Sequence, residues 1–348
     1  MATKSADGYE HYYVPEQSAF PILATVGLFF TVFGAATFFN EIQSGDSGIG
    51  GYLSLAGLGI LFTTLFYWFR QAITENMQGL NSAQMKRSYV WGMGWFIFSE
   101  VMFFVAFFGA LFYVRNLAGP WLGGEGDKGK FIHLLWENYR YAWPMMETPD
   151  QVVNGAKAVF VGAGEGHSMY PVDAHGGLLK WLPMWNTIIL LSSSVTVHIA
   201  HVGLKDDNRK KFTRWLGITV LLAVGFLYLQ YAEYHEAYVD LGLTLESGIY
   251  GTTFFMLTGF HGFHVFLGMT MLAIMWLRAR KGHFSHEEAF GFEAASWYWH
   301  FVDVVWVCLF FFVYIISIRV FIDRLLLGWS LQIRKFALVP RCADFKLT

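Results

Sequence analysis

The chain has 348 residues, of which 55% are hydrophobic, 19% aromatic and only 14% charged, and its mean hydropathy is +0.40. Soluble domains carry about 25% charged residues, so this composition indicates a membrane protein. A net charge of −2 provides no basic surface for a nucleic acid partner. With only two cysteines, Cys308 and Cys342, the chain has no disulfide framework, CxxC zinc site, iron–sulfur cluster or thiolate copper centre.

Residues 1–19 form a polar segment with a single lysine, which matches neither a signal peptide nor a transit peptide. We expect this segment to be cytoplasmic and the first helix to act as the insertion signal. Seven later segments reach the length of about 20 apolar residues that crosses a bilayer. They are residues 20–39, 52–69, 90–114, 182–201, 215–236, 250–277 and 294–318. Their continuous apolar character excludes barrel strands and predicts an all-α integral membrane protein with seven transmembrane helices.

The distribution of lysine and arginine predicts the orientation. The N-terminal segment and the second, fourth and sixth connections together carry 12 of these residues, whereas the short connections 40–51 and 237–249 carry none. Because basic loops stay on the cytoplasmic side, we predict a cytoplasmic N-terminus and an external C-terminus. The tail, residues 319–348, has six basic residues on the predicted outer side, which opposes this assignment.

The third connection, residues 115–181, is a long glycine-rich segment that we predict to be an external loop. Its Glu165, His167, Asp173 and His175 could form a metal site, although a hydrated surface loop is the more common role for such residues. The apolar and basic composition of the tail suits a segment that lies on the membrane surface.

Glu100 lies in the middle of the third predicted helix, in the run WFIFSEVMFFVAFF. Its helical neighbours are aromatic or aliphatic, so the carboxyl group must face protein or a special lipid environment. One interpretation is a proton-responsive or lipid-contacting group. The other is a neutral carboxyl hydrogen-bonded to another helix.

Two HxxH pairs, His198 with His201 and His261 with His264, each place two imidazoles on one face of a helix. This spacing is compatible with metal ligation, but neither pair has an accompanying ExxH carboxylate set. We therefore interpret these histidines as hydrogen-bonded packing residues. The alternative is an independent membrane metalloenzyme.

The fifth predicted helix ends in QYAEYHEAY, where Glu233 and Glu236 share a face near the outer membrane surface. We expect these carboxyls to support packing between helices or contact with a partner; a proton exit role is the alternative. The sixth helix contains Gly251, Gly259, Gly262 and Gly268, which allow close approach of a neighbouring helix.

The segment 290–306 reads FGFEAASWYWHFVDVVW and places Glu293, Ser296, His300 and Asp303 at offsets of 0, 3, 7 and 10. These offsets fall on one helical face, and a polar stripe inside an apolar helix must face protein. Since no complete ligand set accompanies it, we interpret the stripe as a polar seam that holds the last helix in its bundle.

Several of these motifs resemble subunit III of the haem–copper cytochrome c oxidase family. They are GMGWFIFSEVMFFVAFF, NTIILLSSSVTVHIAH, NRKKF, LQYAEYHEA, GIYGTTFFMLTGFHGFHVFLG and FGFEAASWYWHFVDVVW. The resemblance covers roughly residues 12–318, apart from most of the third connection. Quinol-oxidase members typically lack the first two helices, so seven helices favour the cytochrome c type.

The resemblance implies two bundles, residues 20–69 and 90–318, joined by a cytoplasmic loop, residues 70–89, and flanking a V-shaped lipid cleft. It also implies a subunit with no redox centre, beside a subunit I that carries haem a, haem a3 and copper, in a complex with subunit II and cytochrome c. The family's cleft carboxylate corresponds to Glu100 through FIFSE, and its attributed roles are proton uptake, lipid binding and protection of subunit I. The candidates for lipid contact or packing are Trp68, Phe96, His201, His261 and His264.

The chain also departs from the family pattern. His198 replaces a small or hydroxyl residue, and the tail has no counterpart. The third connection is much longer than in mitochondrial members, which favours a bacterial inner membrane over a mitochondrial one. A transporter is a further alternative, but we detect no repeat or broken helix pair that would support it.

Overall fold

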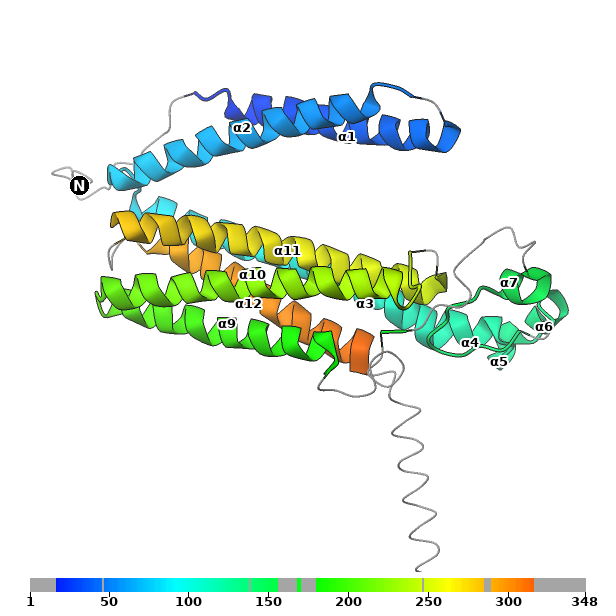
Figure 1. The fold of residues 1–348 in the computed structure, drawn as a ribbon. Helices are drawn as coiled ribbons and strands as arrows, with labels where there is room; N and C mark the ends of the chain where they lie inside the picture. The colour runs from blue at the N-terminus through cyan, green and yellow to red at the C-terminus, as the bar shows by residue number, and fades with distance from the viewer. Residues whose placement is uncertain are drawn as a thin grey trace, which may run out of the picture. The chain divides into compact units, whose positions relative to one another are not determined.

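The computed structural model describes residues 17–45, 47–137, 139–155, 168–169, 180–245, 247–284 and 289–315. Within these ranges the chain is helical and contains no strand (Figure 1). Seven helices in the described part are long and apolar enough to cross a membrane, which confirms the predicted fold class. They are α1 (Phe20–Ser44), α2 (Gly50–Met77), α3 (Ala83–Tyr113), α9 (Leu182–Lys205), α10 (Arg209–Val239), α11 (Gly248–Lys281) and α12 (Phe290–Leu309).

The helices extend beyond the segments predicted from hydropathy. Helix α11 has 34 residues, which at 1.5 Å per residue is about 51 Å, far more than the ~30 Å of a hydrocarbon core. Helix α3 continues through the π-helical turn η1 (Val114–Ala118) and α4 (Gly119–Leu122), and α12 continues through η4 (Phe310–Ile315). Backbone hydrogen bonding therefore persists into the polar layers on either side of the apolar segments.

The chain divides into two compact units, residues 1–93 and 94–348. In the first unit, α1 and α2 pack through buried glycines spaced seven residues apart, Gly27 and Gly34 on α1 and Gly50 and Gly57 on α2. A Cβ atom at Gly57 would overlap the backbone nitrogen of Thr31, so only glycine permits this approach.

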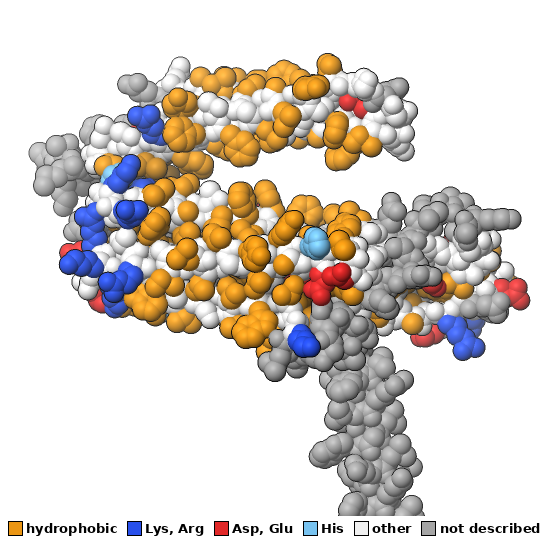
Figure 2. Space-filling model, viewed as in Figure 1, with side chains coloured by type: hydrophobic (Ala, Val, Ile, Leu, Met, Phe, Trp, Pro, Cys, Tyr) orange, Lys and Arg blue, Asp and Glu red, His pale blue; other side chains and the backbone are white. Residues whose placement is uncertain are grey.

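Outside the polar C-terminal turns of the two helices, the rest of the surface of α1 and α2 is largely apolar and exposed. Phe29, Phe33, Leu55 and Phe62 keep 54–67% of their surface area accessible. Figure 2 shows hydrophobic side chains along the visible face of this helical pair. A surface of this kind is suited to lipid or to an apolar partner.

In the second unit, α9, α10, α11 and α12 pack side by side (Figure 1). Helix α12 contributes two of the three fully buried tryptophans of the described chain, Trp299 and Trp306. Phe226 of α10 packs edge-on against Trp306 at 4.8 Å between ring centroids. Large aromatic side chains therefore build the centre of this bundle.

The long third connection contains four short helices in its described part, α4, α5 (Gly126–Gly129), α6 (Ile132–Leu135) and α7 (Pro149–Asn154). It is attached to the bundle where the amide of Tyr250 donates to the Met145 carbonyl at 3.2 Å and the amide of Met169 donates to the Tyr250 hydroxyl at 3.2 Å. The candidate metal group Glu165, His167, Asp173 and His175 lies outside the described residues.

Candidate functional site

Glu100 on α3 contacts His264 on α11. The distance from Glu100 Oε2 to His264 Nε2 is 2.9 Å. The side chain of His264 is 7% exposed and that of Glu100 is 24% exposed, so the pair begins inside the bundle and its carboxyl group reaches the surface of the second unit.

The second imidazole nitrogen fixes the number of protons in this pair. His264 Nδ1 lies 2.6 Å from the carbonyl oxygen of Phe260, and because a carbonyl only accepts, Nδ1 carries a proton. The contact between Nε2 and the carboxyl then requires one more proton, carried by either partner. The pair is thus a neutral acid beside a neutral imidazole, or a carboxylate beside an imidazolium, and its net charge is zero in both forms.

Aromatic rings enclose the imidazole. The ring of His264 lies 5.0 Å from that of Phe104, edge to face, and stacks on Tyr298 at 6.4 Å. Tyr298 also stacks on Phe96, one of the predicted lipid-contact or packing residues, at 5.9 Å. Phe96 is 45% exposed. These rings exclude water from the histidine side of the pair and leave the carboxyl side open.

The two histidines of HGFH contact different neighbouring helices. His261 is fully buried on α11, donates through Nε2 to the Val302 carbonyl at 3.1 Å, and lies 5.1 Å from the ring of Trp306. His264 instead contacts Glu100. In the part of the chain that the structure describes, no three His, Cys, Asp or Glu side chains come together as metal ligands.

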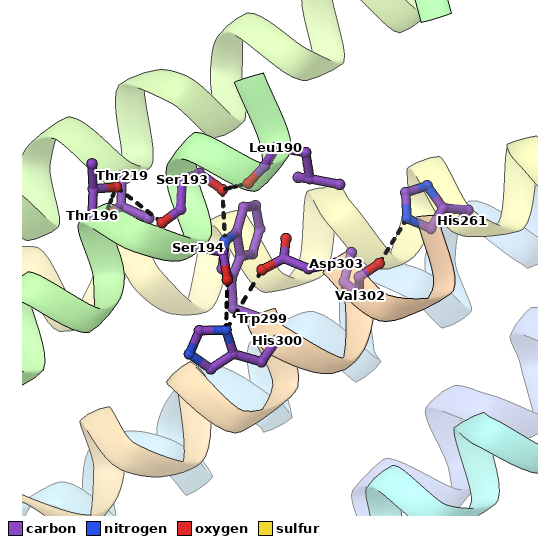
Figure 3. A network of polar contacts seen from close by, with 10 residues as sticks. All are labelled: Leu190, Ser193, Ser194, Thr196, Thr219, His261, Trp299, His300, Val302 and Asp303. Carbon is purple, nitrogen blue, oxygen red and sulfur yellow. Dashed lines mark hydrogen bonds and ion pairs between the residues drawn. The ribbon is translucent and has the colours of Figure 1, made fainter. Parts of the chain in front are cut away.

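The polar residues of α12 face α9 (Figure 3). His300 Nδ1 lies 2.9 Å from the Ser194 hydroxyl and 3.6 Å from an oxygen of Asp303, which is buried. One end of the same face carries Glu293, whose carboxylate lies 3.4 Å from Nε2 of His201 on α9. The face predicted to be a seam therefore contains both buried and half-exposed pairs.

Hydroxyl groups on α9 complete this contact, and the sequence reasoning did not single them out. The indole of Trp299 donates to the Ser193 hydroxyl at 3.0 Å, and Thr196 shares a hydrogen bond of 2.8 Å with Thr219 of α10 (Figure 3). Ser296 of the predicted seam is also buried, on α12. The run SSSVT in an apolar helix was the available signal, because buried hydroxyls there need partners on neighbouring helices.

A second polar cluster lies near the other end of the bundle. Glu233 on α10 is fully buried, accepts a hydrogen bond of 2.6 Å from the Tyr314 hydroxyl, and lies 3.4 Å from the amide nitrogen of Asn186. These contacts connect α9, α10 and η4. The predicted packing role of Glu233 fits this geometry.

The remaining candidates belong to α2 and α9. Trp68 belongs to α2 in the first unit, where it stacks on Phe20 at 6.1 Å and is 40% exposed. His198 is exposed on α9, one turn from His201.

Comparison with known proteins agrees with the resemblance seen in the motifs. The family model for cytochrome c oxidase subunit III matches residues 10–124 and 166–318 and leaves out 125–165, within the long third connection. Cytochrome c oxidase subunit 3 of Dugong dugon is 34% identical over 87% of this chain and 96% of its own length. The proteins of the same name from Squalus acanthias and Drosophila melanogaster are each 35% identical over 87% of this chain and 96% and 95% of their own lengths. The chain therefore belongs to the cytochrome c oxidase subunit III family.

Proposed function

We propose that this chain is a non-redox subunit of a proton-pumping terminal oxidase that transfers electrons from cytochrome c to oxygen. In this role it contacts subunit I directly, and subunit II and cytochrome c belong to the same complex. Haem a, haem a3 and copper reside in the partner subunits, and this chain supports proton uptake and the stability of subunit I during turnover.

The single observation that carries the proton role is the contact between Glu100 and His264. A pair that shares one proton in two forms of equal net charge can pass that proton between its members without any change in the net charge of the site. The Nδ1–H bond to Phe260 fixes the orientation of the ring, so that Nε2 faces the carboxyl. With its carboxyl partly exposed, the pair is suited to exchange protons with groups outside the bundle.

A lipid role is the second part of the proposal. Phe96 presents exposed aromatic surface, and Glu100 lies one turn from it on the same helix; Trp68 of the first unit is exposed as well. Aromatic surface beside the intramembrane carboxyl of Glu100 favours the binding of phospholipids at this surface.

We assign the chain to a bacterial inner membrane, with the mitochondrial inner membrane as the alternative, and with a cytoplasmic N-terminus and a periplasmic C-terminus. The contrast of 12 basic residues against none in alternate connections supports this orientation. A cysteine placed in the 237–249 connection and labelled from outside intact cells tests it.

Co-purification tests the function itself. A tagged full-length chain, extracted in mild detergent, should elute with a haem-bearing subunit and with cytochrome c oxidase activity. The polypeptide separated from its partners should show no haem or copper absorption. Haem or copper absorption retained by the isolated chain would contradict a non-redox role and favour an independent metalloenzyme.

A further inference from the structure

A groove of about 900 Å³ lies between the start of α10 and the end of α11. Its mouth is lined by four cationic side chains, Arg209, Lys210 and Arg214 of α10 and Arg280 of α11. Its lining among the residues that the structure describes includes no acidic side chain. Figure 2 shows lysine and arginine side chains gathered at this end of the bundle.

Hydrogen bonds and ring contacts hold part of the groove in place. Arg209 donates to the carbonyls of Ala279 and Arg280 at 3.2 and 2.6 Å, which joins the two helix ends. The indole of Trp276 donates to the Thr213 carbonyl at 3.1 Å, and the guanidinium of Arg280 lies 5.1 Å from the indole ring. The aromatic wall and one cation are therefore already positioned before any ligand binds.

Two cations in the groove are uncommitted. Lys210 and Arg214 are exposed and make no hydrogen bond or ion pair with the described part of the chain. They are four residues apart on α10, a spacing at which like charges repel. An anion placed between them would remove this repulsion.

Below the cations the lining becomes apolar. Ile218, Val220 and the 71%-exposed Leu221 continue the groove along α10 toward the middle of the helix. Orientation in the membrane requires only that basic residues occur in the loops on one side. The orientation rule does not require basic side chains from two helices to lie together at the end of an apolar groove.

We propose that this groove binds an anionic phospholipid from the leaflet that contacts the basic loops. Its phosphate lies among Lys210, Arg214 and Arg280, and an acyl chain follows Leu221 along α10. The combination of a cationic mouth and an apolar floor matches an anionic lipid better than a free anion or a zwitterionic lipid. The site uses none of the residues around Glu100, so it is distinct from the lipid surface proposed there.

Native mass spectrometry of the delipidated oxidase complex tests this proposal. The complex is titrated with dioleoylphosphatidylglycerol, dioleoylphosphatidylcholine or glycerol 3-phosphate. The test variant is Lys210→Gln/Arg214→Gln. The matched control is Lys205→Gln/Lys281→Gln, which removes two charges from the same side of the bundle outside the groove lining.

We expect wild type and control to bind phosphatidylglycerol alike, and the groove variant to bind it about thirtyfold more weakly. Phosphatidylcholine and glycerol 3-phosphate should not compete for the site. An equal loss in both variants, an unchanged groove variant, or full competition by glycerol 3-phosphate would overturn the proposal. The proposal would also be overturned if the groove substitutions released a bound polypeptide from the complex and not a lipid.

Discussion

Glu100 and His264 are 164 positions apart in the chain, yet their side chains meet at 2.9 Å. The proton on His264 Nδ1 is committed to Phe260, so the imidazole has only Nε2 available for the carboxyl. The two side chains therefore act as one unit, and a change in either alters the hydrogen bonding of the other.

Replacement of Glu100 should distinguish its hydrogen bond from its acidity. Glu100→Gln keeps a donor for a neutral His264, whereas Glu100→Ala leaves a nearly buried Nε2 without its partner at a cost of about 1–3 kcal/mol in the free energy of unfolding. We expect Ala, but not Gln, to lower the midpoint of thermal inactivation of the complex.

Both Glu100 variants should keep their haem content and initial rate of oxygen reduction, and both should lose activity sooner during sustained turnover. Haem spectra and oxygen-electrode traces measure these properties. Loss of haem incorporation in either variant would contradict a peripheral role for Glu100.

Trp299 should be far more important for stability than Trp297, its neighbour on α12. Trp299→Phe removes the indole donor to Ser193 inside the bundle, which we expect to cost about 1–3 kcal/mol. Trp297 is 36% exposed, and Trp297→Phe should have little effect. Thermal inactivation of the two variants, side by side, measures the difference, and equal midpoints would argue against a stabilising role for the Trp299–Ser193 hydrogen bond.

The histidines of the two HxxH pairs should differ in the same way. His261→Leu removes a buried donor to Val302 and should destabilise the complex by about 1–3 kcal/mol, whereas the exposed His198 should tolerate leucine. Neither change should alter the metal content of the complex, measured by elemental analysis. A specific loss of metal in either variant would support the alternative of an independent membrane metalloenzyme.

Glycine at position 57 should be essential for the contact between α1 and α2. Gly57→Ala places a methyl group against the backbone of Thr31 and should cost about 1–3 kcal/mol through overpacking. Gly59→Ala, two residues along the same helix, meets open space and serves as the control. Engineered cysteines on α1 and α2 report the contact through their cross-linking rate, which should fall only in the Gly57 variant.

The seven spanning helices could be predicted from the sequence because apolar length alone determines which segments cross a bilayer. Their ends could not, since hydrogen bonding extends α11 and α3 into polar residues that hydropathy excludes. The family could also be predicted, because several long motifs occur in order along the chain.

The site was only partly predictable. A carboxyl in an apolar helix draws attention to Glu100, but no local pattern identifies His264 as its partner, because helix packing brings α3 and α11 together. The same holds for Ser193 and Trp299, where the hydroxyl gives no indication of which helix it will face. Residue type and spacing define one face of a helix, and the neighbour of that face depends on the tertiary fold.

The glycine contact between α1 and α2 has a consequence for biogenesis. Residues 20–77 contain both sides of that contact, and outside the polar C-terminal turns of the two helices the surface of the pair is largely apolar. The hairpin can therefore enter the bilayer and complete its own packing while the ribosome is still translating the later helices. An early anchor of this kind keeps the nascent chain at the membrane until the larger bundle assembles.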